Sequence, residues 1–214
     1  MAACLAAGAA RAGHPLLTED TGVLGKDGRQ LEVHGARAKD EGSRTTAGAA
    51  ALSYGITQKT DLQVELPYVR HDGTGDPSLA LKWRFYDEGP VSMIIKPVVS
   101  EEFWGSALAA SFAPGDFELI GHVGCLRNRI DGERESLWHA SIALLWSFGA
   151  NTKLVVDLGR DTNPDPSSRT SIRERAIGVT YALTADVDLG LGSKKGLSDP
   201  ADERAWLFGA KFRW

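Results

Sequence analysis

The last nine residues constrain the fold of this chain more than any other segment. Soluble proteins usually fray at their termini, yet here aromatic residues continue to the final position. A strand that is apolar on one face and cationic on the other suits a barrel with lipid outside and water inside. We therefore expect the closing strand of a transmembrane β-barrel rather than an edge strand of a soluble sandwich. One face carries Trp206, Phe208, Ala210, Phe212 and Trp214, and the other carries Leu207, Gly209, Lys211 and Arg213.

Composition excludes several classes of protein. No apolar run approaches the ~20 residues of a membrane helix, which argues against a helical membrane protein. A barrel strand exposes only alternate residues to lipid, so a charged fraction of 24% is compatible with a barrel. A net charge of -4 argues against a nucleic-acid partner. The two cysteines and five histidines show no metal-binding or redox spacing, so we expect no metal and no cofactor.

The first twelve residues resemble the second half of a secretory signal peptide. Their apolar stretch is followed by Ala10-Arg11-Ala12, a small-x-small cleavage pattern before Gly13. The basic region that begins such signals is missing, so the expectation of export depends on a start further upstream. Cys4 would leave with this peptide, and Cys125 would remain as a small apolar side chain.

From residue 29 to residue 214, segments with period-two alternation are separated by turn-rich breaks. Short connections alternate with mostly longer and more charged ones, as in outer-membrane barrels with short periplasmic turns and longer extracellular loops. The even number of segments places both termini on the periplasmic side. We predict an all-β, antiparallel transmembrane β-barrel of about twelve strands in the outer membrane of a Gram-negative bacterium. The expected strands are 29–40, 44–57, 60–71, 76–88, 91–100, 105–113, 117–128, 135–149, 151–161, 169–184, 186–196 and 203–214.

Two pairs of tryptophans favour lipid contact over a soluble core. Trp138 and Trp146 lie eight residues apart on one face, as do Trp206 and Trp214. Eight residues at ~3.3 Å each, tilted by ~40°, span roughly 20 Å along the barrel axis, which is close to the ~25 Å apolar band. We therefore predict that these four residues, with Trp83, form aromatic girdles. The alternative is that they fill a protein core.

If the apolar faces contact lipid, the opposite faces line a charged lumen. Charge on this scale is tolerated only with water or with mutual pairing. Acids and bases are nearly balanced, and this predicts weak ion selectivity. The expected lumen residues are Glu32, His34, Glu65, Lys82, Arg84, Lys96, Glu118, His122, His139, Lys153, Asp157, Asp161, Glu174, Asp188, Lys194, Lys211 and Arg213.

Catalytic motifs are weak. His139 and Ser141 share one face, and outer-membrane phospholipases of similar strand number use a His and a Ser. Those enzymes place the pair at the lipid-facing surface, whereas here both residues lie opposite the tryptophans. The sequence offers no strong Asn or Asp partner to orient His139, so we do not expect an enzyme.

Residues 13–28 precede the first strand and form either a periplasmic lead or a lumen plug. As a plug, the segment would place Thr18, Glu19 and Asp20 in the lumen, with the two acids paired to Lys or Arg on the wall. Deleting Pro15 to Gly25 would then raise the flux of small solutes. A flexible periplasmic lead would leave the flux unchanged.

Several motifs together resemble a known family. In chain order they are His14-Pro15-Leu16-Leu17-Thr18-Glu19-Asp20-Thr21-Gly22, Tyr54-Gly55-Ile56-Thr57, Asp61-Leu62-Gln63-Val64-Glu65-Leu66-Pro67-Tyr68, Gly75-Asp76-Pro77-Ser78-Leu79-Ala80-Leu81-Lys82-Trp83-Arg84-Phe85, Thr162-Asn163-Pro164-Asp165-Pro166 and the terminal Phe-Arg-Trp. This order, which spans nearly the whole mature chain, resembles outer-membrane barrels assigned to transport in the meta-pathway of phenol degradation. The resemblance implies passage of small molecules, including hydrophobic or aromatic compounds, and it carries over no substrate residues.

We therefore expect an outer-membrane channel or transporter for small molecules. The first alternative is a closed barrel with a structural or ligand-binding role, since twelve strands lie between filled and open barrels. The second is a soluble secreted β-protein that binds an apolar ligand. The expected partners are the lipid bilayer, lipopolysaccharide, an unidentified small solute and, through the C-terminal strand, the outer-membrane assembly machinery.

Overall fold

The computed structural model describes residues 15–40, 43–70, 73–199, 201 and 204–214, which form an all-β structure. Its strands are β1 (Arg29–Asp40), β2 (Ser43–Gly55), β3 (Thr60–Val69), β4 (Gly73–Thr74), β5 (Ser78–Glu88), β6 (Val91–Val99), β7 (Phe103–Phe112), β8 (Phe117–Asn128), β9 (Ser136–Phe148), β10 (Thr152–Asp161), β11 (Ile172–Ala182), β12 (Val187–Gly196) and β13 (Arg204–Arg213). No helix among these residues is long and apolar enough to cross a membrane.

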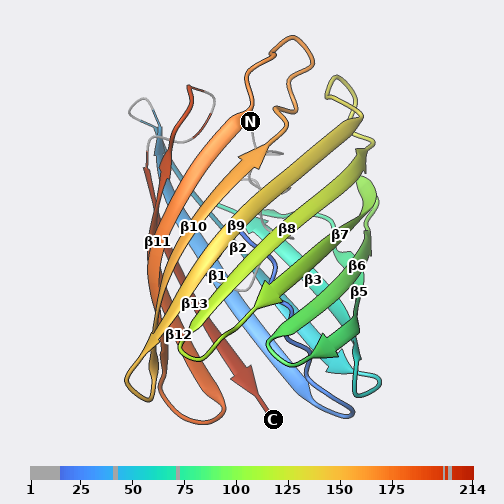
Figure 1. The fold of residues 1–214 in the computed structure, drawn as a ribbon. Helices are drawn as coiled ribbons and strands as arrows, with labels where there is room; N and C mark the ends of the chain where they lie inside the picture. Colours follow the sequence, from blue (N-terminus) through green and yellow to red (C-terminus); the bar gives the residue numbers. More distant parts are fainter. Residues whose placement is uncertain (1–14, 41–42, 71–72, 200, 202–203) are drawn as a thin grey trace.

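The twelve long strands close into an antiparallel barrel (Figure 1). Each strand pairs with the next along the chain, and β1 pairs with β13 to complete the ring. The closing ladder runs from Gln30 opposite Arg213 to Lys39 opposite Arg204. The two-residue β4 adds only a short bridge to β3. Closure removes both free sheet edges, so the backbone hydrogen bonds of the wall are satisfied within it.

The outer wall is apolar because alternate residues of each strand point away from the barrel axis. Ile142, Ile177 and Leu191, for example, are about half exposed, and so are many other large apolar side chains on this face. Phe117 lies opposite Trp146 in the ladder, and their rings stack with centroids 6.1 Å apart. Such a surface is unfavourable in water and favourable in lipid.

The sequence prediction of fold class is confirmed, with short periplasmic turns and longer extracellular loops. Each of the twelve predicted strands agrees with an observed one to within three residues at either end. β7 begins at Phe103, two residues before the predicted start, and so includes Trp104 on the outer wall. Gly105 obscured the start of this strand, since glycine carries no side chain for the alternation. The proposed signal peptide, residues 1–12, lies outside the described residues.

A charge on the outer wall should destabilise the barrel strongly. Ile142 lies on β9 midway between Trp138 and Trp146, and we expect Ile142→Arg to lower the free energy of unfolding by about 2–4 kcal/mol. Urea titration of the protein folded in lipid vesicles measures this change. Thr170→Arg, in an exposed loop, is the control and should have little effect. A loss below about 1 kcal/mol for Ile142→Arg would contradict burial of this position in the bilayer.

Candidate functional site in the barrel lumen

The N-terminal segment, residues 15–28, lies inside the barrel before the chain enters β1. Its buried residues contact strands on several sides of the ring. Pro15 and Thr18 are among the most deeply buried side chains of the described structure. The site is therefore built from two parts, the inner wall and this segment.

Two glycines make room for the start of the segment. Gly178 on β11 and Gly192 on β12 are direct cross-strand partners on the inner face. A Cβ atom added at Gly178 would lie 2.8 Å from Pro15 Cγ, and one added at Gly192 would lie 3.1 Å from Pro15 Cβ. Pro15 thus packs against the bare backbone of these two glycines, and the side chain of any other residue there would occupy its space.

Thr18 and Leu17 are held by Asp157 of β10. The backbone N–H groups of Leu17 and Thr18 donate to Asp157 Oδ2 over 2.7 and 2.9 Å. Thr18 Oγ1 lies 2.9 Å from Asp157 Oδ1 and 2.8 Å from Ser141 Oγ. Asp157 is fully buried. A buried carboxylate is tolerated here because it accepts several hydrogen bonds from the segment.

Glu19 and Asp20 form an ion-pair network with lysines from three strands. Lys96 Nζ on β6 lies 2.8 Å from Glu19 Oε2. Lys82 Nζ on β5 lies 3.0 Å from Glu19 Oε1 and 2.7 Å from Asp20 Oδ1. Lys211 Nζ on β13 lies 3.7 Å from Asp20 Oδ2. Two adjacent acids of the segment therefore contact the neighbouring strands β5 and β6 and also β13, which is not adjacent to them in the ring.

The charge state of these two acids follows from their surroundings. Burial raises the pKa of each carboxyl, but the nearby lysine ammonium groups lower it by more. The pKa of Glu19 and the pKa of Asp20 therefore both lie below the ordinary values. Both residues stay ionised at neutral pH.

Further contacts lead the segment to the periplasmic end. Thr21 Oγ1 lies 2.6 Å from Ser92 Oγ and 2.8 Å from Ser111 Oγ. The Leu24 N–H donates to Asp61 Oδ2 over 2.9 Å. Gly55 N–H then donates to the Gly28 carbonyl, next to the start of β1.

Gly55 is required at this exit for a steric reason. A Cβ atom at Gly55 would lie 1.7 Å from the Gly25 carbonyl oxygen, which is a severe clash with backbone. Gly25 itself has a φ of 79°, a left-handed conformation that favours glycine. The two glycines together allow the segment to turn into β1.

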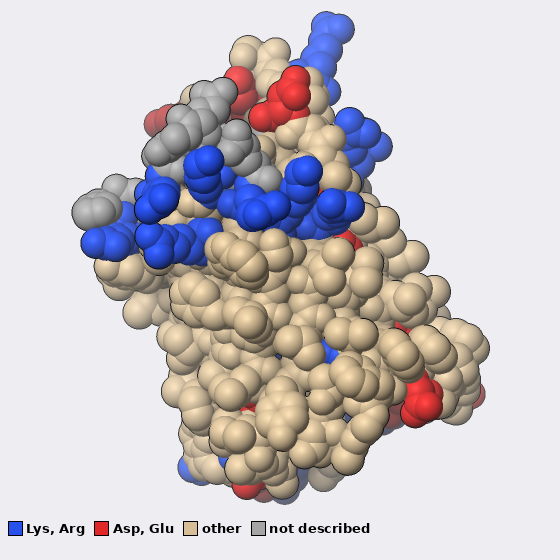
Figure 2. All heavy atoms as spheres, turned by 90° about the vertical axis from the view of Figure 1, so that its left-hand side faces the viewer, with Lys and Arg blue, Asp and Glu red and all other residues tan. Residues whose placement is uncertain are grey.

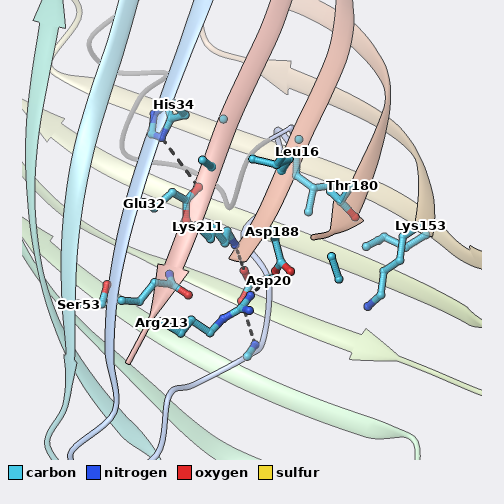
Figure 3. Close-up of a pocket in the computed structure, with 18 of the residues that line it drawn as sticks. Leu16, Asp20, Glu32, His34, Ser53, Lys153, Thr180, Asp188, Lys211 and Arg213 are labelled. Carbon is cyan, nitrogen blue, oxygen red and sulfur yellow. Dashed lines mark hydrogen bonds and ion pairs between the residues drawn. The ribbon is translucent and has the colours of Figure 1, made fainter. Parts of the chain in front are cut away.

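Several of the remaining predicted lumen residues form pairs across neighbouring strands. Lys211 also lies 3.4 Å from Glu32, and Lys194 lies 2.7 Å from Glu174. Figure 3 shows Glu32, Lys211, Asp188 and Arg213 beside Asp20, with Arg213 bonded to Asp188.

Three other predicted lumen residues form no cross-strand pair of this kind within the described part of the chain. Glu65 is buried, Lys153 lies exposed near the periplasmic turn after β9, and Arg84 lies 3.3 Å from Asp87 on its own strand. Four residues that contact or form the segment were not predicted, although Asp61 shares the inner face with Gln63 and Glu65; they are Thr21, Asp61, Ser92 and Ser111.

The expectation that His139 lacks an acidic partner was wrong. His139 Nδ1 lies 2.9 Å from Asp161 Oδ1, and His139 Nε2 lies 2.9 Å from Ser141 Oγ. Asp161 is the direct cross-strand partner of His139, twenty-two positions away in sequence, so only the strand register brings them together. Thr18 Oγ1 donates to Ser141 Oγ, so this group of side chains also contacts the N-terminal segment.

Two of the cavities bounded by the described residues lie in the barrel interior. The larger, of about 470 Å³, is lined by the segment, by wall residues such as Glu118 and Lys153, and by the periplasmic turn at residues 149–151. The smaller, of about 40 Å³, is lined by His122, His139, Leu126 and Leu137. Glu19 and Lys96 line both cavities, so their ion pair lies between the two spaces.

The five predicted girdle tryptophans are all exposed on the outer wall. Trp138 and Trp206 lie near the extracellular ends of β9 and β13. Trp146 and Trp214 lie near the periplasmic ends of β9 and β13, and Trp83 lies at the middle of β5, opposite Thr60 at the periplasmic start of β3. Whether they contact the headgroup regions stays a prediction.

Comparison with known proteins identifies the fold. No protein-family model matches the sequence, and no curated protein is significantly similar to it. Among solved structures, the KdgM porin has a TM-score of 0.68 at 6% identity, covering 86% of this chain and 98% of that chain. The COG4313 outer membrane channel from Pseudomonas putida F1 has a TM-score of 0.66 at 14% identity, covering 91% and 98%. The NanC porin has a TM-score of 0.63 at 12% identity, covering 85% and 98%.

At these identities the likeness concerns the fold. The three similar structures share a closed β-barrel of nearly the same extent as this chain. A barrel with an exposed apolar outer wall is stable only in a bilayer, and closed barrels of this kind span outer membranes. The protein is therefore a twelve-stranded transmembrane barrel of the Gram-negative outer membrane, with the fold of outer-membrane channels.

Proposed function

We propose that this protein is an outer-membrane channel for small solutes whose lumen is closed by residues 15–28 acting as a plug. The observation that carries the proposal is the cavity of about 470 Å³ at the periplasmic end, which is bounded by the N-terminal segment and lined by charged wall residues. Similar folds in outer-membrane channels support the same role. The N-terminal segment would have to leave its position, or rearrange, for solute to pass.

The charges that line this cavity support weak ion selectivity. Selective pores need rings of charge of one sign. Here both signs are present in similar number around the same space. The acids are Glu19, Asp20, Glu32, Asp61, Glu65, Glu118 and Asp188, and the bases are Lys82, Lys96, Lys153, Lys211 and Arg213.

The substrate proposal rests on cavity size and on the family resemblance seen in the sequence. A volume of about 470 Å³ lies within the ~300–1,000 Å³ of typical small-molecule sites. The resemblance to barrels of the phenol meta-pathway extends the proposal to small aromatic compounds. A phenolic hydroxyl could donate to one of the lining carboxylates while its ring lies against Leu16, Ile120 or Leu145.

A closed barrel with a structural or ligand-binding role is the second candidate function. The observation that favours it is the complete burial of Pro15 and Thr18 within the barrel. In that case the larger cavity would be a binding site that opens to the periplasm without a through path.

Single-channel recording of the refolded protein in a planar bilayer distinguishes the channel from the closed barrel. Discrete conductance steps with little ion preference support the channel. A barrel that is demonstrably folded, by its heat-dependent migration in gels, and yet gives no steps under any voltage supports the closed barrel. Liposome swelling with phenol and with a sugar of similar size then tests the preference for aromatic solutes.

Assembly is proposed to depend on the C-terminal strand. β13 closes the ring against β1 and is followed by the exposed Trp214. The apolar, aromatic outer face of this closing strand supports recognition by the outer-membrane assembly machinery.

A further inference from the structure

We propose that the outer wall carries a binding site for the phosphate groups of lipopolysaccharide. The site is a basic patch at the extracellular end of the adjacent strands β10, β11, β12, β13 and β1. Figure 2 shows Lys and Arg gathered in a band above an uncharged belt on this side of the barrel. The patch comprises Arg37, Arg160, Arg173, Arg175, Lys195 and Arg204, all exposed.

The strand register places like charges directly opposite one another. Arg160 lies opposite Arg173, and Arg175 lies opposite Lys195. Directly opposed side chains have Cβ atoms about 5 Å apart, and like charges at this distance are destabilising. Within the described residues, no carboxylate forms an ion pair with any of these four cations; Arg160 bonds only to Ser171 Oγ. Bound anions would relieve this repulsion.

The patch lies at the upper border of the lipid-facing surface. Arg37 is the direct cross-strand partner of Trp206, which is exposed on the outer wall. Below the cations, the same strands expose Leu158, Ile177 and Leu191. A molecule that fits both parts has a polyanionic head and apolar chains, and it lies in the outer leaflet.

Near the extracellular ends of the other strands, the outer wall is mostly apolar rather than basic. There the outer wall exposes Leu79, Val99, Trp104 and Trp138. Arg70, Arg127 and Arg129 are exposed exceptions, but Arg127 lies 3.9 Å from Glu135 and donates to Ser136 Oγ, and Arg129 donates to the Glu101 carbonyl. Among the described residues, exposed cations without a carboxylate partner are therefore more numerous in this sector than on the other side of the barrel, as a specific site requires.

Guanidinium groups suit phosphate because they donate two parallel hydrogen bonds to its oxygens. The lipid A part of lipopolysaccharide carries phosphates on a sugar head above acyl chains, and its chains would lie along the apolar wall below the patch. The cations are on the outer wall, so they do not face a solute inside the lumen. This inference holds whether or not the lumen conducts.

The test compares two triple variants with equal loss of charge. R160Q/R173Q/R175Q removes half of the patch, and R70Q/R127Q/R129Q removes three exposed cations from the other side of the barrel. Folded protein in detergent is titrated with lipid A, with dephosphorylated lipid A and with phosphatidylglycerol, and bound lipid is counted by native mass spectrometry. Heat-dependent gel migration establishes that each variant is folded.

We expect the patch variant to bind lipid A at least about tenfold more weakly than the wild type, and the control to change by less than about twofold. Wild-type protein should bind dephosphorylated lipid A as weakly as the patch variant binds lipid A. Equal affinity of the patch variant and the wild type would overturn the site. Phosphatidylglycerol binding as tightly as lipid A, with the same dependence on the patch, would overturn lipopolysaccharide as the partner.

Discussion

Glu19→Gln/Asp20→Asn should raise the open probability of the barrel strongly. The double substitution leaves Lys82, Lys96 and Lys211 facing the segment without its carboxylates. Removing one partner of a buried ion pair typically costs 3–5 kcal/mol, so the docked state should lose about a hundredfold or more in population. Single-channel recording should then show larger or more frequent conductance steps than for the wild type.

The control for this experiment is Glu101→Gln/Asp116→Asn, which removes the same charge from two exposed connections. A tether gives a second control. Thr21 and Ser111 are in side-chain contact, so cysteines at these positions, with Cys4 and Cys125 replaced by Ser, should hold the segment when oxidised. The double variant in this background should conduct only after reduction. If neither the substitutions nor the disulfide tether changes the conductance, the segment does not act as a plug.

Asp157→Ala should release the beginning of the segment without unfolding the barrel. The substitution removes the acceptor of two backbone N–H groups and leaves Leu17 and Thr18 to find other partners. An unsatisfied buried donor costs about 1–3 kcal/mol, so a loss of about 2 kcal/mol corresponds to a roughly thirtyfold weaker docking equilibrium. Hydrogen–deuterium exchange should become faster by a comparable factor in peptides that cover residues 15–24.

Peptides from β8, β9 and β11 should exchange as in the wild type, since their ladders are intact. Asp186→Ala, in an exposed periplasmic turn, is the matched control and should leave the segment protected. If the segment exchanges rapidly in the wild type as well, it is not stably docked. If Asp157→Ala accelerates exchange throughout the barrel, Asp157 supports the wall rather than the segment.

Much of the wall could be predicted from the sequence because strand geometry is local. Period-two alternation assigns each side chain to one face, and turn residues mark the ends, so twelve strands and their faces were predicted closely. The two-residue difference at the start of β7 lies where glycine and small residues weaken the alternation. The same local rule indicated that Lys82, Lys96 and Lys211 lie inside.

The partners of these residues depend on positions distant in sequence. Asp161 orients His139, and Asp61 accepts a hydrogen bond from Leu24, only because strand register and the path of the segment bring them together. The basic patch likewise joins Arg160 to Arg173 and Arg175 to Lys195 through ladder pairing. No local pattern contains this information.

The sequence by itself determined that this chain forms a barrel, since an apolar face on every strand can be buried only in lipid once the sheet closes. Tertiary structure decided what the barrel contains. The path of residues 15–28 is set by ion pairs and hydrogen bonds to strands throughout the chain, from Lys82 and Lys96 to Asp157 and Lys211. Alternation specifies which way a side chain points, but only the closed ring brings it to its partner.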